Sequence, residues 1–168
     1  MKSSVTYRRV PIGSLIPHEE VDPPKVLELL DEFRRTGVVQ EPILIDRGSR
    51  VILNGHHRWA ALKELGVSRA PVWQVEYTQP SITIDRWEPG PTVTKAEVLD
   101  RARNHRLFPP KTTRHRFGKP PMPRATSIAE LAGTTRRSRA GRKQPTPGRY
   151  GSGVPVPSRA GADSSGGE

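Results

Sequence analysis

The stretch 51–65, VILNGHHRWAALKEL, carries the residues whose types and spacing best suit chemistry. It predicts a strand end, a turn at the Asn-Gly pair and then a helix. This order makes an anion site, because the first N–H groups of a helix are unpaired and its dipole end is positive. An arginine there is unfavourable unless an anion is bound, so phosphate is favoured over simple helix capping. The candidates are Asn54, Gly55, His56, His57 and Arg58.

A second basic segment follows two prolines and reads KTTRH. Two cations, two hydroxyls and an imidazole within five residues can donate to several phosphate oxygens at once. The prolines stiffen the approach to this loop and so lower its ordering cost. Basic loops are usually solvated, so the prediction depends on this loop folding over the 54–58 turn. The candidates are Lys111, Thr112, Thr113, Arg114 and His115.

A third candidate is the polar turn PHEE at 17–20. A carboxylate beside a histidine, here Glu19, can serve as a general base or hold Mg²⁺. A surface turn with two solvated acids is an equally good interpretation of these four residues. No histidine spacing of the HExxH type occurs, so a dedicated metal site in the protein is not predicted. The two common glycine-rich nucleotide motifs, GxxxxGK[ST] and GxGxxG, are also absent.

Short strands and three helices must position these residues, which predicts a small α/β or α+β domain with a mixed sheet. Prolines after Asp22 start the first helix, which Gly37 ends; the second follows Gly55, and Thr94 caps the third. The expected strands are Val5–Val10, Pro42–Asp46, Val51–Leu53, Ala70–Tyr77 and Ser81–Trp87. Residues 111–115 are expected to form a loop.

The formal net charge of +11 is concentrated near the C-terminus. Residues 116–168 carry ten Lys/Arg against three Asp/Glu and nine of the fifteen glycines. Such a segment cannot bury enough apolar surface to offset its ordering entropy, so we predict a folded domain over 1–117 and a disordered basic tail over 118–168. A short helix is possible at Ser127–Ala132. The Arg-rich run Thr135–Lys143 lacks aromatic residues for stacking, so only non-specific contact with nucleic acid is expected.

Composition excludes several classes of protein. The chain has no cysteine, which removes disulfides, thiolate catalysis and cysteine-bound metals. No apolar run reaches the ~20 residues of a membrane span, and the N-terminus lacks the apolar core of a signal peptide. We therefore expect a cytoplasmic protein without a membrane partner.

Taken together, these motifs resemble a known family. The stretch from PILID through VILNGHHRWAALKELG to APVWQVEY resembles the ParB/sulfiredoxin-like superfold. Within it, PHEE, NGHHRW and PPKTTRH resemble the free L-serine kinases over residues 5–117. The resemblance implies transfer of a phosphoryl group from ATP or ADP to the hydroxyl of free L-serine, giving O-phospho-L-serine. Mg²⁺ would bridge the phosphates, as such reactions generally require.

The resemblance also implies a role for each candidate residue. Glu19 would be the catalytic base, and residues 54–58 would hold the nucleotide phosphates. Residues 111–115 would close over the phosphates and the serine. Trp87 matches an aromatic position near the amino-acid pocket, with a packing tryptophan as the competing interpretation. Asn54 stands where the family usually has aspartate, which questions any role of that carboxylate.

Two alternatives stay open. One is a ParB-like nucleotide-binding regulator or DNA-binding protein without kinase activity. After His115, however, the Pro-, Gly- and Arg-rich chain offers no room for the helix-turn-helix domain that ParB proteins use to read DNA. The other is a degenerate relative that binds nucleotide without turnover. Sulfiredoxin chemistry is excluded, because its nucleophile is cysteine.

Overall fold

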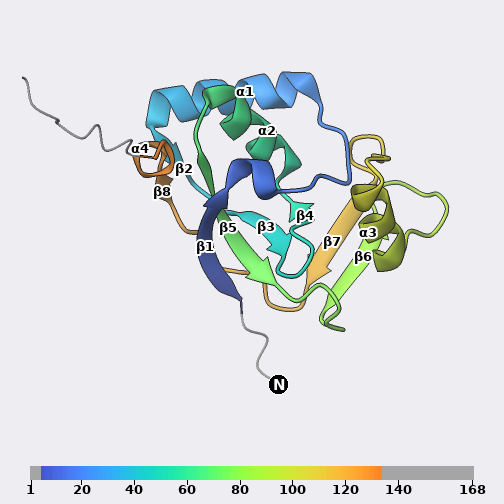
Figure 1. Ribbon diagram of the computed structural model, residues 1–168. Coiled ribbons are helices and arrows are strands. Elements are labelled where there is room, and N and C mark those ends of the chain that lie inside the picture. The colour runs from blue at the N-terminus through green and yellow to red at the C-terminus, as the bar shows by residue number, and fades with distance from the viewer. Residues whose placement is uncertain (1–4, 134–168) are drawn as a thin grey trace, which may run out of the picture. The chain divides into compact units, whose positions relative to one another are not determined.

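A computed structural model describes residues 5–133 (Figure 1). Its four α-helices and one 3₁₀ helix are η1 (Ile12–Ser14), α1 (Pro23–Thr36), α2 (His56–Leu65), α3 (Lys95–Arg103) and α4 (Ile128–Leu131). Its longer strands are β1 (Thr6–Pro11), β3 (Ile43–Asp46), β4 (Ile52–Asn54), β5 (Arg69–Val75), β6 (Ile82–Arg86) and β7 (Thr113–Phe117). Two short strands are β2 (Val38–Val39) and β8 (Thr126–Ser127).

A four-stranded mixed sheet in the order β1-β5-β3-β4 forms the centre of the domain. β5 pairs antiparallel with β1 and parallel with β3, while β3 and β4 form an antiparallel pair. Helices α1 and α2 lie together on one side of this sheet (Figure 1). Two further strand pairs, β6 with β7 and β2 with β8, complete the described part. The predicted mixed α/β class is confirmed.

Helix α1 forms where the sequence signals predict it. Prolines occupy its first turn, and Gly37 ends it in the left-handed region with φ 68°. Its buried face consists of Val26, Leu30 and Phe33. These side chains join the core above the sheet, where Leu62 of α2 is fully buried. Burial of this stripe fixes the start of α1, and therefore the turn before it.

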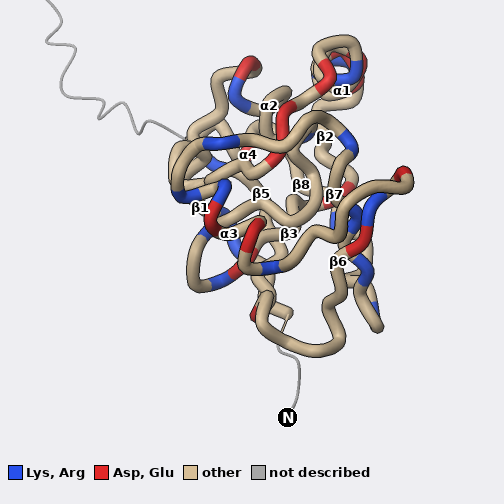
Figure 2. Tube along the Cα trace, turned by 90° about the vertical axis from the view of Figure 1, so that its right-hand side faces the viewer, with Lys and Arg blue, Asp and Glu red and all other residues tan. Residues whose placement is uncertain are grey.

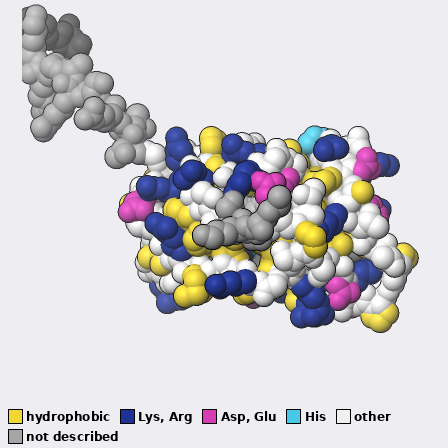
Figure 3. All heavy atoms as spheres, turned by 90° about the horizontal axis from the view of Figure 1, so that it is seen from below, with side chains coloured by type: hydrophobic (Ala, Val, Ile, Leu, Met, Phe, Trp, Pro, Cys, Tyr) yellow, Lys and Arg dark blue, Asp and Glu magenta, His cyan; other side chains and the backbone are white. Residues whose placement is uncertain are grey.

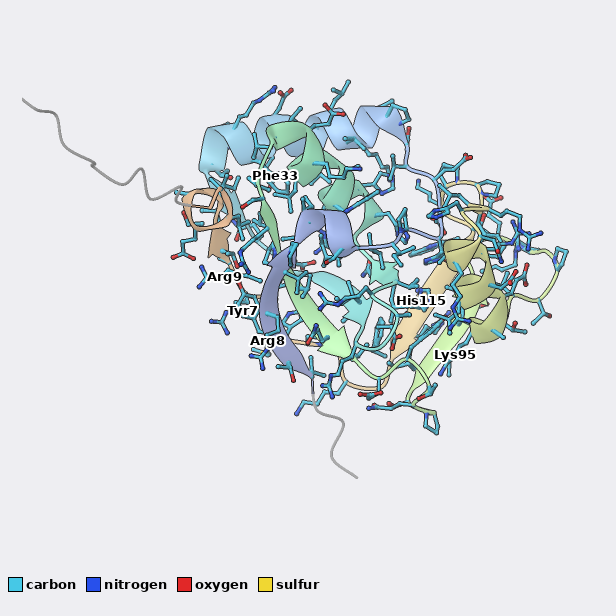
Figure 4. All side chains as sticks on the ribbon, in the orientation of Figure 1. Tyr7, Arg8, Arg9, Phe33, Lys95 and His115 are labelled. Atoms are coloured by element: carbon cyan, nitrogen blue, oxygen red, sulfur yellow. The ribbon has the colours of Figure 1, made fainter. Side chains whose placement is uncertain are left out.

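A second hydrophobic core packs against β6, β7 and α3, in the part of the domain that carries the candidate residues 111–115. It contains Leu53 at the end of β4, Tyr77, Val98 and Phe108. The Thr94 hydroxyl accepts a hydrogen bond from the Glu97 N–H at 3.1 Å, which confirms the predicted cap of α3. Figure 4 places His115 at β7 in this half of the domain, apart from Phe33 beneath α1.

The prediction of a loop at 111–115 is wrong from Thr113 onward. Thr113–Phe117 is strand β7, paired antiparallel with β6 from Ile82 opposite Phe117 to Arg86 opposite Thr113. The basic side chains concealed this strand, because only one of its two faces is covered and the usual apolar alternation is weak. The error matters for function, since a paired strand holds its side chains more rigidly than a loop.

The folded part also extends beyond the predicted boundary at residue 117. β8 pairs with β2, and Leu131 of α4, within the predicted helix at 127–132, is fully buried in the main core. The Tyr7 hydroxyl is hydrogen-bonded to the Thr126 hydroxyl at 2.8 Å, which ties this segment to β1. Residues 134–168, including the Arg-rich run, lie outside the described residues, so the predicted disordered tail stays a prediction there.

Truncation after Phe117 is therefore expected to destabilise the protein. Loss of a buried leucine such as Leu131 alone costs about 2–5 kcal/mol, and β2 would lose its partner strand as well. Thermal unfolding of chains ending at Phe117 and at Gly133 measures this, because the longer chain keeps every described contact. Equal melting temperatures would show that the 118–133 segment adds nothing.

Charges of both signs are interspersed along the described chain (Figure 2). The face viewed in Figure 3 likewise carries Lys and Arg side chains among hydrophobic ones. Among the described helices none has the length and apolar character needed to cross a membrane.

Candidate active site

The turn before α2 has the predicted geometry of an anion site. Gly55 is the residue before the helix and adopts φ 103°, a conformation that side chains other than glycine rarely tolerate. Among the described residues, no side chain caps this end of α2. The first backbone N–H groups of α2 therefore have no side-chain partner among the described residues.

The two histidines of this turn hold the neighbouring segment rather than pointing freely into solvent. Nε2 of His56 accepts a hydrogen bond from the His18 N–H at 3.3 Å, and Nε2 of His57 accepts one from the Asp22 N–H at 3.0 Å. Accepting nitrogens carry no proton, so Nδ1 is the donor in each neutral ring. Burial lowers the pKa of both histidines, and His56 is the more deeply buried.

The PHEE turn and the KTTRH segment are joined by backbone hydrogen bonds. The Phe108 N–H donates to the His18 carbonyl at 2.9 Å, and the Glu20 N–H donates to the Phe108 carbonyl at 2.8 Å. On the other side, the Ile52 N–H of β4 donates to the Ile16 carbonyl at 2.9 Å. The 16–20 segment is therefore fixed between β4 and the chain that leads into β7.

Glu19 is the hub of this arrangement and is 7% exposed. One carboxylate oxygen accepts the Lys111 N–H, and the other accepts the Thr113 N–H at 3.0 Å and the Thr113 hydroxyl at 2.8 Å. Two separate motifs therefore meet on one carboxylate. The interpretation of PHEE as a solvated surface turn is wrong for Glu19, because its side chain is enclosed by the segment 92 residues further along the chain.

A cavity of about 730 Å³ unites the three motifs. It is lined by Glu19, Lys25, Leu53, Asn54, Gly55, His56, His57, Trp87, Glu88, Lys111, Thr113, Arg114 and His115. The KTTRH segment thus does reach the turn before α2, which the sequence could only suppose. Three cationic side chains, Lys25, Lys111 and Arg114, line this cavity. Two carboxylates, Glu19 and Glu88, are among its described lining residues.

Trp87 lies at the rim of this cavity and is 56% exposed. The guanidinium of Arg114 lies over its ring, 4.5 Å from the centroid. Trp87 is therefore not a core residue, although its ring does pack against Arg114. Thr112, in contrast, is not among the lining residues, and its hydroxyl donates to the Pro109 carbonyl at 2.8 Å to fix the turn.

Arg58 is the one candidate of the 54–58 turn that points away from the cavity. Its guanidinium donates to the carbonyls of Glu41 and Pro42, each at 2.8 Å, and lies 3.7 Å from the Glu41 carboxylate. The Glu41 carboxylate and the two carbonyl oxygens therefore take the place of the bound anion that the sequence predicts beside Arg58. Its predicted phosphate contact is therefore not supported, and its position indicates a structural role.

Replacement of Arg58 by methionine is expected to affect stability more than ligand binding. The Glu41 and Pro42 carbonyls would each lose a charged donor, and such hydrogen bonds contribute about 1.5–3 kcal/mol each. Denaturant unfolding measures the loss, with Arg34→Met on the exposed face of α1 as the matched control. A loss of nucleotide affinity without a loss of stability would contradict the structural role.

Lys25 is a cavity residue that the sequence motifs did not reveal. It lies in the first turn of α1, and the neighbouring Lys111 ammonium lowers its pKa. The Asp22 and Glu28 carboxylates act in the opposite direction and raise its pKa. Two ammonium groups this close together still favour a bound polyanion. Its signal in the sequence was its place just after the Pro23-Pro24 helix start, which follows the PHEE turn directly.

Within residues 5–133, no group of three or more His, Asp or Glu residues is arranged to hold a metal ion. Glu19 already uses both oxygens for hydrogen bonds from the 111–113 segment, which favours the general base over the metal ligand among its two predicted roles.

Sequence comparison finds several kinases. An ATP-dependent L-serine kinase of Staphylothermus marinus is 33% identical over 85 residues, which cover 48% of this chain and 34% of the relative. An ADP-dependent L-serine kinase of Thermococcus kodakarensis is 26% identical over 107 residues, 61% of this chain and 44% of the relative. A ParB-like protein of Sulfolobus acidocaldarius is 34% identical over 73 residues, 44% of this chain and 36% of the relative. The chain thus spans less than half the length of these curated relatives, and no protein-family model matches it.

Structure comparison finds the same group. A free serine kinase in complex with AMP superposes with a TM-score of 0.70 at 18% identity, covering 76% of this chain and 94% of that structure. A glutamate-to-glutamine mutant of a free serine kinase, also with AMP, gives a TM-score of 0.70 at 17% identity over the same shares. The chain therefore has the fold of the free serine kinase structures, and its motif-based resemblance to L-serine kinases and ParB-like proteins is confirmed.

Proposed function

We propose that this protein is a nucleotide-dependent L-serine kinase that transfers a phosphoryl group from ATP or ADP to the serine hydroxyl, giving O-phospho-L-serine. The observation that carries the proposal is the single cavity in which an oriented carboxylate, an open helix start and several cations face one another. Phosphoryl transfer requires mainly positioning, cations around the phosphoryl oxygens and a carboxylate aimed at the acceptor. The similarity to named L-serine kinases supports this choice of reaction and substrate.

In this proposal Glu19 is the catalytic base. Its carboxylate lines the cavity and is held by two backbone N–H groups and one hydroxyl, so its orientation is fixed before substrate binds. An ionised carboxylate is an acceptor only, which suits it to take the hydroxyl proton of serine. The serine would lie between Glu19 and the exposed face of Trp87, within reach of Arg114.

The nucleotide phosphates would bind at the start of α2. Gly55 lets them approach the backbone, and Lys25 and Lys111 would surround them with positive charge. His57 could add an Nδ1–H donor, because its Nε2 is already used as an acceptor. Asn54 offers an amide in place of the carboxylate usual in the family, which reduces the negative charge close to the phosphates.

Mg²⁺ completes the proposal. It would neutralise negative charge that develops on the phosphoryl group during transfer. Mg²⁺ is commonly held by one or two protein oxygens together with substrate phosphates and water, so the lack of a metal cluster within residues 5–133 is compatible with this role.

The second candidate function is a ParB-like regulator that binds nucleotide without turnover. Asn54 favours it, because a carboxylate lost from a phosphate site can cost catalysis while binding survives. Incubation of the protein with L-serine, Mg²⁺ and either ATP or ADP separates the two. Formation of O-phospho-L-serine supports the kinase, whereas nucleotide binding without product, together with salt-sensitive DNA binding, supports the regulator.

A further inference from the structure

His18, the neighbour of Glu19, is fully buried and has no part in the proposed function so far. Its Nδ1 lies 2.7 Å from the Ile52 carbonyl, and its Nε2 lies 2.9 Å from the Thr113 hydroxyl. The same hydroxyl lies 2.8 Å from the second oxygen of Glu19. A continuous hydrogen-bonded chain therefore runs from the base through Thr113 and His18 to the backbone of β4.

This hydrogen-bonded chain of groups lacks one proton when Glu19 is ionised and His18 is neutral. A carbonyl can only accept, so Nδ1 of His18 must carry the ring proton, which leaves Nε2 as an acceptor. The Thr113 hydroxyl has one hydrogen, yet it faces two acceptors, Nε2 of His18 and the carboxylate of Glu19. One of the two contacts stays without a proton until another arrives.

We propose that His18 and Thr113 form a relay that accommodates the proton taken by Glu19 from the acceptor hydroxyl, and so act as positioning residues for the transfer. The inference rests on the proposed function for the source of that proton. The geometry of the chain itself, with three contacts between 2.7 and 2.9 Å, is independent of it.

The step balances without any added reactant. The O–H bond of the serine hydroxyl breaks as its oxygen bonds to the phosphorus, and the proton passes to the Glu19 oxygen that faces Thr113. The bond from that phosphorus to the bridging oxygen of the nucleotide breaks at the same time, and the nucleotide leaves with the electron pair, as ADP from ATP or as AMP from ADP. Glu19 then donates to the Thr113 hydroxyl oxygen, whose own hydrogen turns toward Nε2 of His18. Both contacts are then satisfied, and no group in the relay changes its charge except Glu19.

The surroundings of His18 keep its ring neutral through this step. Burial lowers the pKa of His18 to about 4. The rings that face it are His56 at 4.5 Å and His115 at 5.6 Å between centroids, with Phe108 at 6.3 Å. Burial also holds the pKa of His56 and His115 below the ordinary range, and Lys95 lowers that of His115 further.

The first test replaces His18 by asparagine or by glutamine. Asparagine can keep the donor to the Ile52 carbonyl but removes the acceptor at the Nε2 position, whereas glutamine places an acceptor oxygen there. We expect kcat of His18→Asn to fall about tenfold, as for one lost hydrogen bond in the transition state, with KM for serine and nucleotide unchanged and with partial rescue in His18→Gln.

The pH profile gives the readout that a purely structural role would not move. Without Nε2 the Thr113 hydroxyl donates permanently to Glu19, which makes the carboxylate a weaker base. The acid limb of kcat should therefore move to lower pH in His18→Asn. An acid limb at the wild-type position, or equal kcat for both His18 variants, would overturn the relay.

Variants of Thr113 keep the test decisive where a His18 variant does not fold. Thr113→Val removes the relay hydroxyl but keeps the backbone N–H that binds Glu19, and Thr113→Ser restores the hydroxyl. We expect the loss of kcat in the valine variant to be recovered in the serine variant. Equal kcat for the two variants would contradict the relay.

A spectroscopic readout separates failure of the relay from failure of the proposed function. In the ¹⁵N NMR spectrum of histidine-labelled protein at pH 7.5, we expect His18 to have a protonated Nδ1 and an unprotonated Nε2. A protonated Nε2 overturns the relay whatever the kinase assay gives. The expected tautomer in a protein that forms no phosphoserine would leave the hydrogen-bonded chain intact and reject the kinase alone.

Discussion

Replacement of Glu19 by glutamine is expected to reduce the turnover of L-serine by about 10²- to 10⁴-fold, the usual contribution of a general base. The glutamine amide cannot take a proton from the hydroxyl, while the side chain keeps nearly the same volume in the cavity. Nucleotide affinity should change only a few-fold, because the phosphates would contact the start of α2 and the lysines rather than this carboxylate. Steady-state kinetics and calorimetric binding of nucleotide measure the two effects separately.

The same substitution should also loosen the segment that Glu19 holds. The two backbone N–H groups of Lys111 and Thr113 each need an acceptor, and a glutamine side chain offers only one oxygen. A modest drop in melting temperature is therefore expected alongside the loss of turnover. Glu20→Gln is the matched control, because Glu20 is exposed and does not line the cavity. Equal turnover in Glu19→Gln and wild type would remove Glu19 as the base.

The parts of the fold that follow from local signals were predictable from the sequence. Proline at the start and glycine at the end defined α1, and apolar alternation defined β5. β7 was missed because its residues are mostly basic and its apolar signal is weak. The segment at 118–133 was misjudged for a different reason: its composition is that of a disordered chain, and contacts with distant parts of the chain stabilise it, namely the β2–β8 pairing and the burial of Leu131 in the main core.

The candidate site shows the same division between local and long-range information. Gly55 and the open start of α2 were predictable, since a strand, a glycine and a helix in sequence imply that geometry. The direction of the Arg58 side chain was not, because its carbonyl partners lie 16 and 17 residues earlier in the chain. Lys25 was missed because its relevance comes only from its proximity to Lys111, which the tertiary fold creates.

Replacement of Lys25 or Lys111 by methionine is expected to have opposite effects on the free protein and on its complex with nucleotide. In the free protein each substitution relieves the repulsion between two ammonium groups, so the melting temperature should rise slightly. In the complex each lysine would donate a charged hydrogen bond to phosphate, and its loss should weaken nucleotide binding about 10- to 100-fold. Thermal melts without nucleotide measure the expected rise in melting temperature, and melts with nucleotide measure the expected loss of binding.

The double variant sharpens the test, because the two substitutions remove the same repulsion. Lys25→Met combined with Lys111→Met should be no more stable in the free state than either single variant, whereas its loss of nucleotide affinity should exceed that of either one. Its affinity should also depend less on salt, since fewer charges attract the phosphates. Lys119→Met is the matched control, an exposed lysine that does not line this cavity. Additive gains in free-state stability would mean that the two ammonium groups do not interact, and the polyanion site inferred from their proximity would then lose its basis.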